Sequence, residues 1–207
     1  MKEKLVLIGN GMAGVRTLEE LLKLAPERYA ITVFGAEPYG NYNRILLSPV
    51  LAGEKTVEQI MLNDDQWYVD NGIKLHKGKS VVAIDRAKRI VRAADGTEEP
   101  YDRLILATGS VPFIIPIPGK DLQGVVAFRD IQDVDRMLAA ASGKGHAVVI
   151  GGGLLGLEAA NGLLKQGMQV SVVHLLDTLM EKQLDKPAAG LLKRSLEERG
   201  LNFLMGA

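Results

Sequence analysis

The chain has 207 residues, of which 47% are hydrophobic and 24% charged, so it can bury a core as one large or two small domains. Its 25 Lys and Arg residues balance its 25 Asp and Glu residues, which leaves no net charge to attract nucleic acid or an anionic membrane. Because it contains no cysteine, it has no redox dithiol, cysteine-ligated iron–sulfur cluster or Cys-type zinc site of its own. We predict no metal site.

The apolar runs of the chain are short. Residues 104–107 and 147–150 are typical, and they have the length of strands rather than the roughly 20 residues of a membrane span. The segment Met1 to Lys4 leads directly into the first apolar run, without the apolar core of a signal peptide. We therefore predict a cytoplasmic protein with neither membranes nor nucleic acid as partners.

Residues 6–14 predict a strand that runs through a glycine turn into a helix, which continues to Leu24. The turn has the pattern G-x-G-x-x-G, in which the first glycine permits the tight turn, the second lets backbone N–H groups approach a pyrophosphate, and the third lets the helix pack on the strand. The helix N-terminus then faces the phosphates with its partial positive charge. The candidate cofactor-binding residues are Gly9, Gly11, Met12, Ala13 and Gly14.

Residues 29–34 predict a second strand, which completes a βαβ unit and so a parallel sheet. The first carboxylate after it is Glu37, and we expect it to bond a ribose hydroxyl of the bound nucleotide. The alternative is a solvated loop acid before Pro38.

The next part of the chain changes character twice. Residues 46–52 predict a short helix, and residues 56–71 predict an amphipathic helix in which Trp67 and Tyr68 pack rather than bind a ligand. Residues 73–103 have the punctuation of hairpins. They predict an antiparallel insertion with strands at 73–76, 80–85, 89–93 and 99–101. A strand at 103–107 follows and is closed by Thr108 and Gly109.

Prolines and a glycine between residues 112 and 119 indicate an interdomain connection. After a predicted helix at 131–141, a second fingerprint follows a strand at 148–150 and opens a helix that extends through Lys165. Its candidate nucleotide-binding residues are Gly151, Gly153, Leu154, Leu155, Gly156 and Glu158. Glu158 has two alternatives, a backbone cap or a pair with a helix neighbour.

A strand at 169–174, a helix at 187–199 and a strand beginning at 202 complete the chain. One glycine fingerprint is a weak signal, but two in strand–turn–helix context are strong. We predict an α/β protein with two Rossmann-like, doubly wound and mainly parallel folds. Residues 1–112 form the first, with an antiparallel insertion, and residues 113–207 form the second. Because a second fold needs more strands, we expect it to be truncated and the chain to be an N-terminal section.

Three histidines need an interpretation. His174 ends the partner strand of the second fingerprint, where an acid suits the ribose 2′-OH of NADH and a base suits the 2′-phosphate of NADPH. We include it in the nucleotide site, which leaves the preference between NADH and NADPH open; the alternative is an exposed structural histidine. His76 and His146 lack a partner motif, and we predict that both are structural.

The two fingerprints and the segment Tyr101 to Ser110, YDRLILATGS, resemble those of flavoprotein pyridine nucleotide reductases with two dinucleotide-binding domains. The stretch Asn41 to Glu54, NYNRILLSPVLAGE, resembles more narrowly the N-terminal flavoprotein portion of NAD(P)H-dependent nitrite reductase large subunits. The resemblance implies FAD in the first fold, with Thr108 and Gly109 passing close to it, and NAD(P)H in the second. It also implies that such a flavin fold is finished by later strands, so the 207 residues alone would hold FAD poorly.

The resemblance further places Arg44 beside the flavin ring, where a cation stabilises the anionic reduced form. The alternative for Arg44 is a loop ion pair. Hydride would pass from NAD(P)H to FAD, and the electrons would go on to downstream iron–sulfur and sirohaem domains outside this chain, or to a separate acceptor, for reduction of nitrite to ammonia. Other interpretations are a ferredoxin or rubredoxin reductase, an NADH oxidase, or a nucleotide-binding module without turnover.

Overall fold

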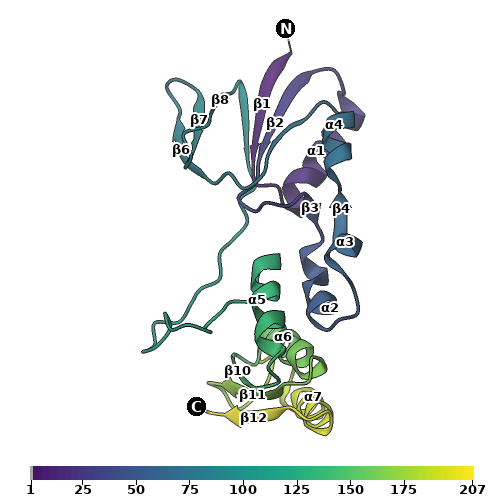
Figure 1. Ribbon diagram of the computed structural model, residues 1–207, viewed down its shortest axis with the longest axis vertical. Helices are drawn as coiled ribbons and strands as arrows, with labels where there is room; N and C mark the ends of the chain where they lie inside the picture. The colour runs from purple at the N-terminus through teal and green to yellow at the C-terminus, as the bar shows by residue number, and fades with distance from the viewer. Residues whose placement is uncertain (1) are drawn as a thin grey trace. The chain divides into compact units, whose positions relative to one another are not determined.

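The computed structural model describes residues 2–207, which form two compact units (Figure 1). The first unit contains the chain up to Asn43 together with Ile60–Ser110, and the second contains Arg44–Gln59 together with Val111–Ala207. The chain thus passes from one unit to the other near residue 110, but the segment 44–59 belongs to the second unit. The assignment of residues 1–112 and 113–207 to two cofactors stays a prediction.

A parallel sheet of four strands forms the centre of the first unit, in the order β5-β2-β1-β9. Strand β1 pairs with β2 through Leu7 and Val33, and with β9 through Leu7 and Ile105. This confirms the predicted βαβ crossover. The bounds are β1 Glu3–Ile8, β2 Tyr29–Phe34, β5 Lys74–His76 and β9 Arg103–Leu106.

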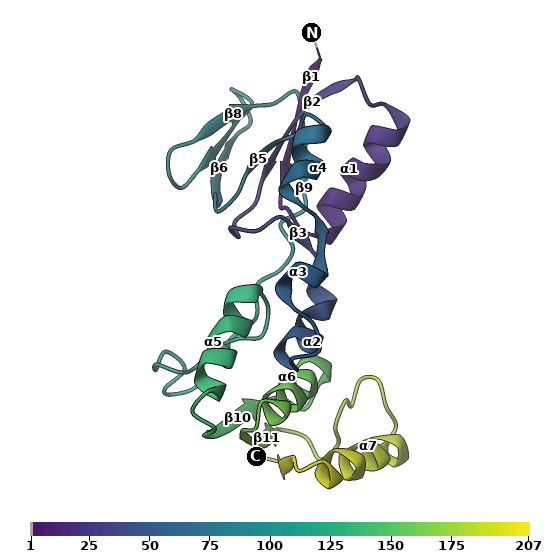
Figure 2. The ribbon, with the colours of Figure 1, turned by 45° about the vertical axis from the view of Figure 1, so that its right-hand side comes forward.

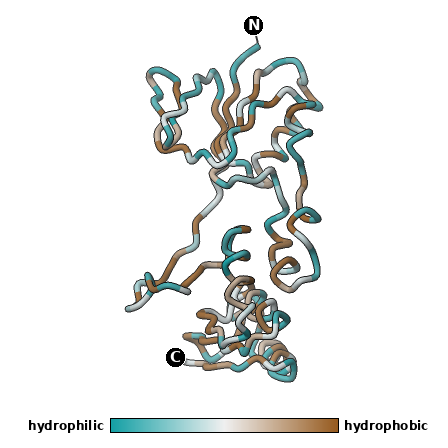
Figure 3. Tube along the Cα trace, in the orientation of Figure 1, coloured by the Kyte–Doolittle hydropathy of each residue, from teal (hydrophilic) through white to brown (hydrophobic). Residues whose placement is uncertain are grey.

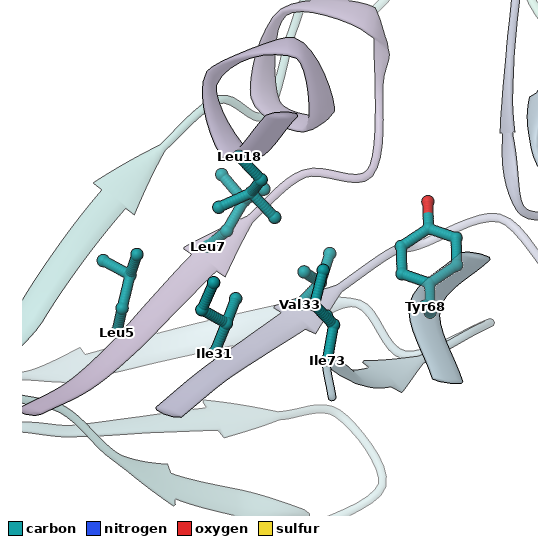
Figure 4. Packing of buried hydrophobic residues seen from close by; sticks show 7 residues of the cluster. All are labelled: Leu5, Leu7, Leu18, Ile31, Val33, Tyr68 and Ile73. Carbon is teal, nitrogen blue, oxygen red and sulfur yellow. The ribbon is translucent and has the colours of Figure 1, made fainter. Parts of the chain in front are cut away.

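Helices α1 (Met12–Leu24) and α4 (Asp65–Asp70) cover one face of this sheet, as Figures 1 and 2 show. Because side chains alternate along a strand, every second residue of β1 and β2 points to these helices. Figure 4 shows the resulting core, in which Leu18 from α1 lies over Leu7 and Tyr68 comes from α4. The buried members are Leu5, Leu7, Leu18, Ile31, Val33, Tyr68 and Ile73.

The other face of the sheet is covered by an antiparallel three-stranded sheet, β6 (Val81–Asp85), β7 (Ile90–Ala93) and β8 (Glu98–Pro100). Val91 and Ala93 of β7 pack against the alternate side chains of the parallel sheet. The antiparallel insertion is therefore confirmed for β6, β7 and β8, and its hydrophobic face provides the second layer of the core. The strand predicted at 73–76 is not part of it, because β5 pairs parallel with β2 through Leu75 and Val33.

The single helix predicted for residues 56–71 is wrong. The segment forms a short helix α3 (Val57–Ile60), a strand β4 (Met61–Asn63) and helix α4. Strand β4 pairs antiparallel with β3 (Asn41–Tyr42), and the side-chain amide of Asn41 donates to the Asn63 Oδ1 at 2.9 Å. The Asp64 carboxylate accepts from the Trp67 N–H at 2.9 Å and so begins a new helix.

The second unit is built on a parallel sheet with the order β10-β11-β12. Buried side chains of α6 and β11, among them Leu163 and Val172, form its core. The bounds are β10 His146–Ile150, β11 Gln169–His174, β12 Asn202–Met205, α5 Ile131–Ala141, α6 Leu154–Lys165 and α7 Lys186–Glu198.

The segment 44–59 joins this unit through helix α2 (Leu47–Leu51), which follows a 3-10 turn at Arg44–Leu46. Helices α2 and α6 are in contact (Figure 2), and a Cβ added to Gly162 of α6 would lie 2.7 Å from Leu51 Cγ. Gln166 donates to the Leu51 carbonyl at 2.8 Å, and Lys165 pairs with Glu54. The predicted short helix is found, held to α6 by close packing.

Loops and turns lead from β9 to α5, and they include the three prolines Pro112, Pro116 and Pro118. Figure 3 shows hydrophobic residues along this segment, and Val111 and Phe113 are 89% and 83% exposed. Proline explains the irregular backbone because it lacks an N–H and disfavours helix in the residue before it.

Within residues 2–207 there is no helix with the length and apolar character needed to cross a membrane.

A polar cluster joins β5 to β8 in the first unit. Glu99 accepts from Lys74 at 2.5 Å and from His76 at 2.9 Å, and the His76 ring stacks on Phe34 with centroids 4.7 Å apart. Burial raises the pKa of the Glu99 carboxyl, but the hydrogen bonds from Lys74 and His76 outweigh burial, so its pKa lies below the ordinary value.

We expect Glu99→Gln to lower the free energy of unfolding at pH 7 by on the order of 1 kcal/mol, because it removes a charged acceptor. A carboxylate with a lowered pKa stabilises the fold above its unfolded pKa, and this contribution is lost as the pH falls. The difference in the free energy of unfolding between wild type and variant, measured with urea at pH 7 and pH 4, should therefore be smaller at pH 4. A difference that stays constant with pH would contradict the assignment.

Candidate dinucleotide-binding sites

In the first glycine loop, two of the three glycines are needed by the protein itself. Gly9 has φ +112°, and a Cβ there would lie 2.1 Å from the carbonyl oxygen of Ala107. A Cβ on Gly14 would lie 2.6 Å from the carbonyl oxygen of Gly9. Gly11 differs, since its φ is −87° and no protein atom lies within 4 Å of an added Cβ.

The second loop repeats this arrangement. Gly151 has φ +118°, and a Cβ on Gly156 would lie 2.1 Å from the Gly151 carbonyl oxygen. Gly153 has φ −85°, and an added Cβ would again have no protein atom within 4 Å. Neither the backbone nor the protein packing therefore requires glycine at Gly11 or Gly153.

These two glycines are also the N-caps of α1 and α6, and neither helix has a side-chain cap or an acidic residue in its first turn. Helices α4, α5 and α7 each begin with an aspartate that accepts a backbone N–H, namely Asp64, Asp130 and Asp185. The first N–H groups of a helix have no intrahelical acceptor and carry partial positive charge. The two glycine loops are thus shaped and polarised for an anionic group such as a pyrophosphate.

The remaining candidates of the two fingerprints lie in the first turns of these helices. Met12 and Ala13 begin α1, and Leu154 and Leu155 begin α6, where their side chains are 55% and 52% exposed. Their backbone N–H groups therefore belong to the uncapped turns.

A hydrogen-bond network fixes the first loop through Asn10, which lies between Gly9 and Gly11. The Tyr68 hydroxyl donates to Asn10 Oδ1 at 2.7 Å, and Asn10 Nδ2 donates to the Tyr39 carbonyl at 3.4 Å. Burial raises the pKa of Tyr68 to about 12, so its phenol remains a protonated donor. A Cβ on Gly35 would lie 2.9 Å from Asn10 Cβ. Gly35 therefore leaves room for this side chain.

Two further candidates of the first unit follow strand ends. Glu37 comes three residues after β2, and its carboxylate accepts from the Tyr42 hydroxyl at 2.6 Å. Thr108 and Gly109 come just after β9 and are exposed, with φ +73° at Gly109. The ribose role of Glu37 and the cofactor contact of Thr108 and Gly109 stay predictions.

In the second unit, Glu158 is bonded to a residue from a distant part of the sequence. Ser48 Oγ of α2 donates to Glu158 Oε2 at 2.5 Å. Glu158, Gly162 and Gln166 are spaced by four residues and thus share the face of α6 that meets α2. The hydrogen-bond donor to the Glu158 carboxylate therefore comes from another helix. Neither alternative considered for Glu158, a backbone cap or a pair within its own helix, included such a partner.

A cavity of about 270 Å³ opens beside this pair. It is smaller than most complete small-molecule sites, so it can hold only part of a dinucleotide. Arg44 Nη1 donates to the carbonyl of Arg129 at 2.5 Å at its edge. The lining residues are Arg44, Ile45, Leu47, Ser48, Phe128, Arg129, Leu154, Leu155 and Glu158.

His174 is buried, in contrast to the exposed structural histidine considered as its alternative. Its Nδ1 lies 3.1 Å from the Gly152 nitrogen, and its Nε2 lies 3.1 Å from the Thr178 carbonyl oxygen. The ring is therefore engaged with backbone groups below the second glycine loop. His76 bonds to Glu99, and His146 Nε2 lies 2.9 Å from Ser171 Oγ.

Two parallel sheets, each with a glycine loop at the N-terminus of its first helix, define the class of dinucleotide-binding α/β proteins. The model of the protein family described as "Pyridine nucleotide-disulphide oxidoreductase" matches residues 3–207. The chain belongs to this family.

Two curated relatives come from Bacillus subtilis (strain 168). "Nitrite reductase [NAD(P)H]" is 56% identical over 99% of this chain and 25% of its own length. "Assimilatory nitrate reductase electron transfer subunit" is 50% identical over 99% of this chain and 26% of its own length. The chain spans about a quarter of the length of these relatives.

A solved structure with a similar fold is NADH:rubredoxin oxidoreductase from Clostridium acetobutylicum. It superposes with a TM-score of 0.89 at 28% identity, over 100% of this chain and 53% of the other. This likeness confirms the predicted α/β architecture with Rossmann-type folds.

Sequence reasoning missed the partners that hold the site residues. A glycine in the interior of a helix usually has a packing reason, so Gly162 was a signal for a close neighbour that the sequence analysis did not use. No local pattern connects Tyr68 to Asn10 or Ser48 to Glu158, because these pairs are 58 and 110 positions apart.

We expect Tyr68→Phe to destabilise the protein by about 1 kcal/mol, because it removes a partly buried hydrogen bond and leaves Asn10 Oδ1 without that donor. Amide hydrogen exchange at residues 9–12 should become faster, whereas exchange in α6 should not change. Tyr29→Phe, in the same unit at the start of β2, is the matched control. Equal exchange at residues 9–12 in both variants would show that Tyr68 does not hold the loop.

Proposed function

We propose that the first glycine loop binds the pyrophosphate of FAD and the second that of NAD(P)H. The observation that carries this proposal is the pair Gly11 and Gly153. Each caps a helix without a side-chain acceptor, and each leaves open the space that a Cβ would fill. A phosphate in that space accepts hydrogen bonds from the N–H groups of the first helical turn, which have no intrahelical acceptor.

The order of the two cofactors is supported by the resemblance, and the use of a nicotinamide nucleotide is supported by the relatives. Both B. subtilis relatives align with nearly the whole chain, and one is named for NAD(P)H. In the first unit Glu37 would bond the adenosine ribose, and Thr108 and Gly109 would pass close to the flavin. The second unit offers the uncapped turn of α6 and the cavity beside Glu158 to the nicotinamide nucleotide.

The chemistry that FAD would supply is acceptance of hydride from the reduced nicotinamide. The residues of the chain contribute position and charge to that transfer. The Ser48 hydroxyl donates to the Glu158 carboxylate at 2.5 Å, and Arg44 supplies a cation to the lining of the same cavity. We assign to Arg44 the stabilisation of the anionic reduced flavin.

The electrons then leave the chain, because its 207 residues include no cysteine pair to receive them. We propose that they pass to iron–sulfur and sirohaem domains of a longer polypeptide, which reduce nitrite to ammonia. The likeness to rubredoxin oxidoreductase favours a second candidate, transfer to a separate redox protein. NADH-dependent turnover of the protein at its natural length, with nitrite, rubredoxin or oxygen as acceptor, decides between these functions.

Replacement of Gly11 by valine should abolish FAD binding, and Gly153→Val should abolish NAD(P)H binding, since the side chains fill the space of the phosphates. Both φ values are accessible to valine, so the fold should persist by circular dichroism. Flavin content and nucleotide titration, measured at natural length, check this expectation.

The matched control is Gly145→Val, since Gly145 likewise has no protein atom within 4 Å of an added Cβ and lies outside both loops. It should retain both cofactors. Normal flavin content in the Gly11→Val protein would contradict the proposed FAD site.

Removal of Arg44 should make the flavin midpoint potential more negative, because only the reduced ring carries the charge that Arg44 opposes. Loss of about 1.4 kcal/mol corresponds to ~30 mV for a two-electron couple, so we expect a shift of tens of millivolts in Arg44→Ala. Arg44→Lys should retain most of the potential because it keeps the charge. An unchanged midpoint in the alanine variant with FAD still bound, measured by dye-coupled titration, would contradict the role of Arg44 at the flavin.

A further inference from the structure

The middle residue of the second fingerprint, Gly152, is held on both sides of its backbone. Its N–H lies 3.1 Å from His174 Nδ1, and its carbonyl accepts from the Met180 N–H at 3.0 Å. Both partners come from the end of β11 and the loop that follows it. The Gly152 backbone is therefore directed into the protein rather than toward the open side of the loop.

The hydrogen bonds fix the state of the His174 ring. Because Gly152 can only donate through its N–H, Nδ1 must carry the lone pair. Nε2 then carries the proton and donates to the Thr178 carbonyl at 3.1 Å, with the Glu181 Oε2 at 3.3 Å as a second acceptor. The neutral imidazole thus links the glycine loop to residues 178–181.

The packing around Gly152 leaves no room for a side chain at this position. An added Cβ would lie 2.6 Å from Leu179 Cδ2 and 2.9 Å from His174 Cγ. His174 and Leu179 are 9% and 1% exposed. These two side chains pack directly against the backbone of the loop at Gly152. Both nitrogens of the His174 ring are already hydrogen-bonded within the protein, so neither is available to a ligand.

We propose that His174 is a positioning residue for the second glycine loop, which it holds in the conformation that receives the nucleotide pyrophosphate, and that it does not contact the ribose 2′ position. This inference rests on the proposed NAD(P)H site. It replaces the expectation that His174 selects between NADH and NADPH. Loss of the hydrogen bond between Gly152 and His174 should weaken the binding of NADH and of NADPH by the same factor, because both nucleotides carry the same pyrophosphate.

Three substitutions separate the roles of the two ring nitrogens. Asparagine carries its amide oxygen the same number of bonds from Cβ as Nδ1, so His174→Asn keeps the acceptor for Gly152. His174→Gln places its amide at the distance of Nε2 and keeps only the contact with Thr178. His174→Leu keeps neither contact.

The test is calorimetric titration of the protein at natural length with NADH and with NADPH. Loss of one hydrogen bond should weaken both nucleotides roughly three- to tenfold in His174→Leu and His174→Gln, with an unchanged ratio between them. His174→Asn should bind close to wild type. His146→Leu, which removes a histidine bond at the opposite end of β10, is the control and should leave both affinities unchanged.

Each contrary outcome has a distinct meaning. An altered NADH to NADPH ratio would show that His174 contacts the 2′ position, and wild-type affinity in His174→Gln would show that the Gly152 bond does not matter. An asparagine variant as weak as the leucine variant would also overturn the proposal. Should the leucine variant fail to fold, the asparagine and glutamine pair still decides. Absence of nucleotide binding by the wild-type protein would instead refute the proposed function itself.

Discussion

The close approach of helix to strand at the third glycine of each fingerprint is the constraint on which both units depend. At Gly14 and Gly156 an added Cβ would lie 2.6 Å and 2.1 Å from the carbonyl oxygen of the first glycine, which excludes a side chain. This contact fixes the start of the helix directly above the end of the preceding strand. It leaves the N-terminal N–H groups at the loop, where the aspartate caps used by the other long helices are missing. The steric requirement thus leaves uncapped, partially positive N–H groups at each loop, where we propose that the pyrophosphates bind.

A second steric relation, between Leu51 and Gly162, explains why the segment 44–59 belongs to the second unit. With no side chain at Gly162, α2 approaches α6 closely enough for Ser48 to reach Glu158 and for Gln166 to reach the Leu51 carbonyl. The cavity residues Arg44 and Ser48 are thereby brought beside the first turn of α6. One missing side chain in the helix interior therefore assembles most of the candidate nicotinamide site.

The parts of the fold that depend on short-range patterns could be predicted from the sequence. The glycine loops combine backbone strain and close packing within a few residues, so their positions and the flanking strands and helices follow from the motif. The helix predicted at 56–71 failed because β4 is specified by its pairing with Asn41 and Tyr42, about 20 residues earlier. His174 was assigned by its place at a strand end, but the direction of its ring depends on Gly152 and Leu179, which no periodicity reveals.

The two loops also differ in how much of the chain each one needs. The first loop is closed by the carbonyl of Ala107, which lies against Gly9 although the two residues are near opposite ends of the first unit's sequence. The second loop is closed by His174 and Met180, fewer than about 30 residues after Gly152. Contacts between distant residues form more slowly because a longer loop must close first. During synthesis the first loop therefore cannot be completed until β9 has been made. The second loop can form almost as soon as its own helix and strand have left the ribosome. The loop nearest the N-terminus thus needs the longer stretch of chain to be made before it is complete.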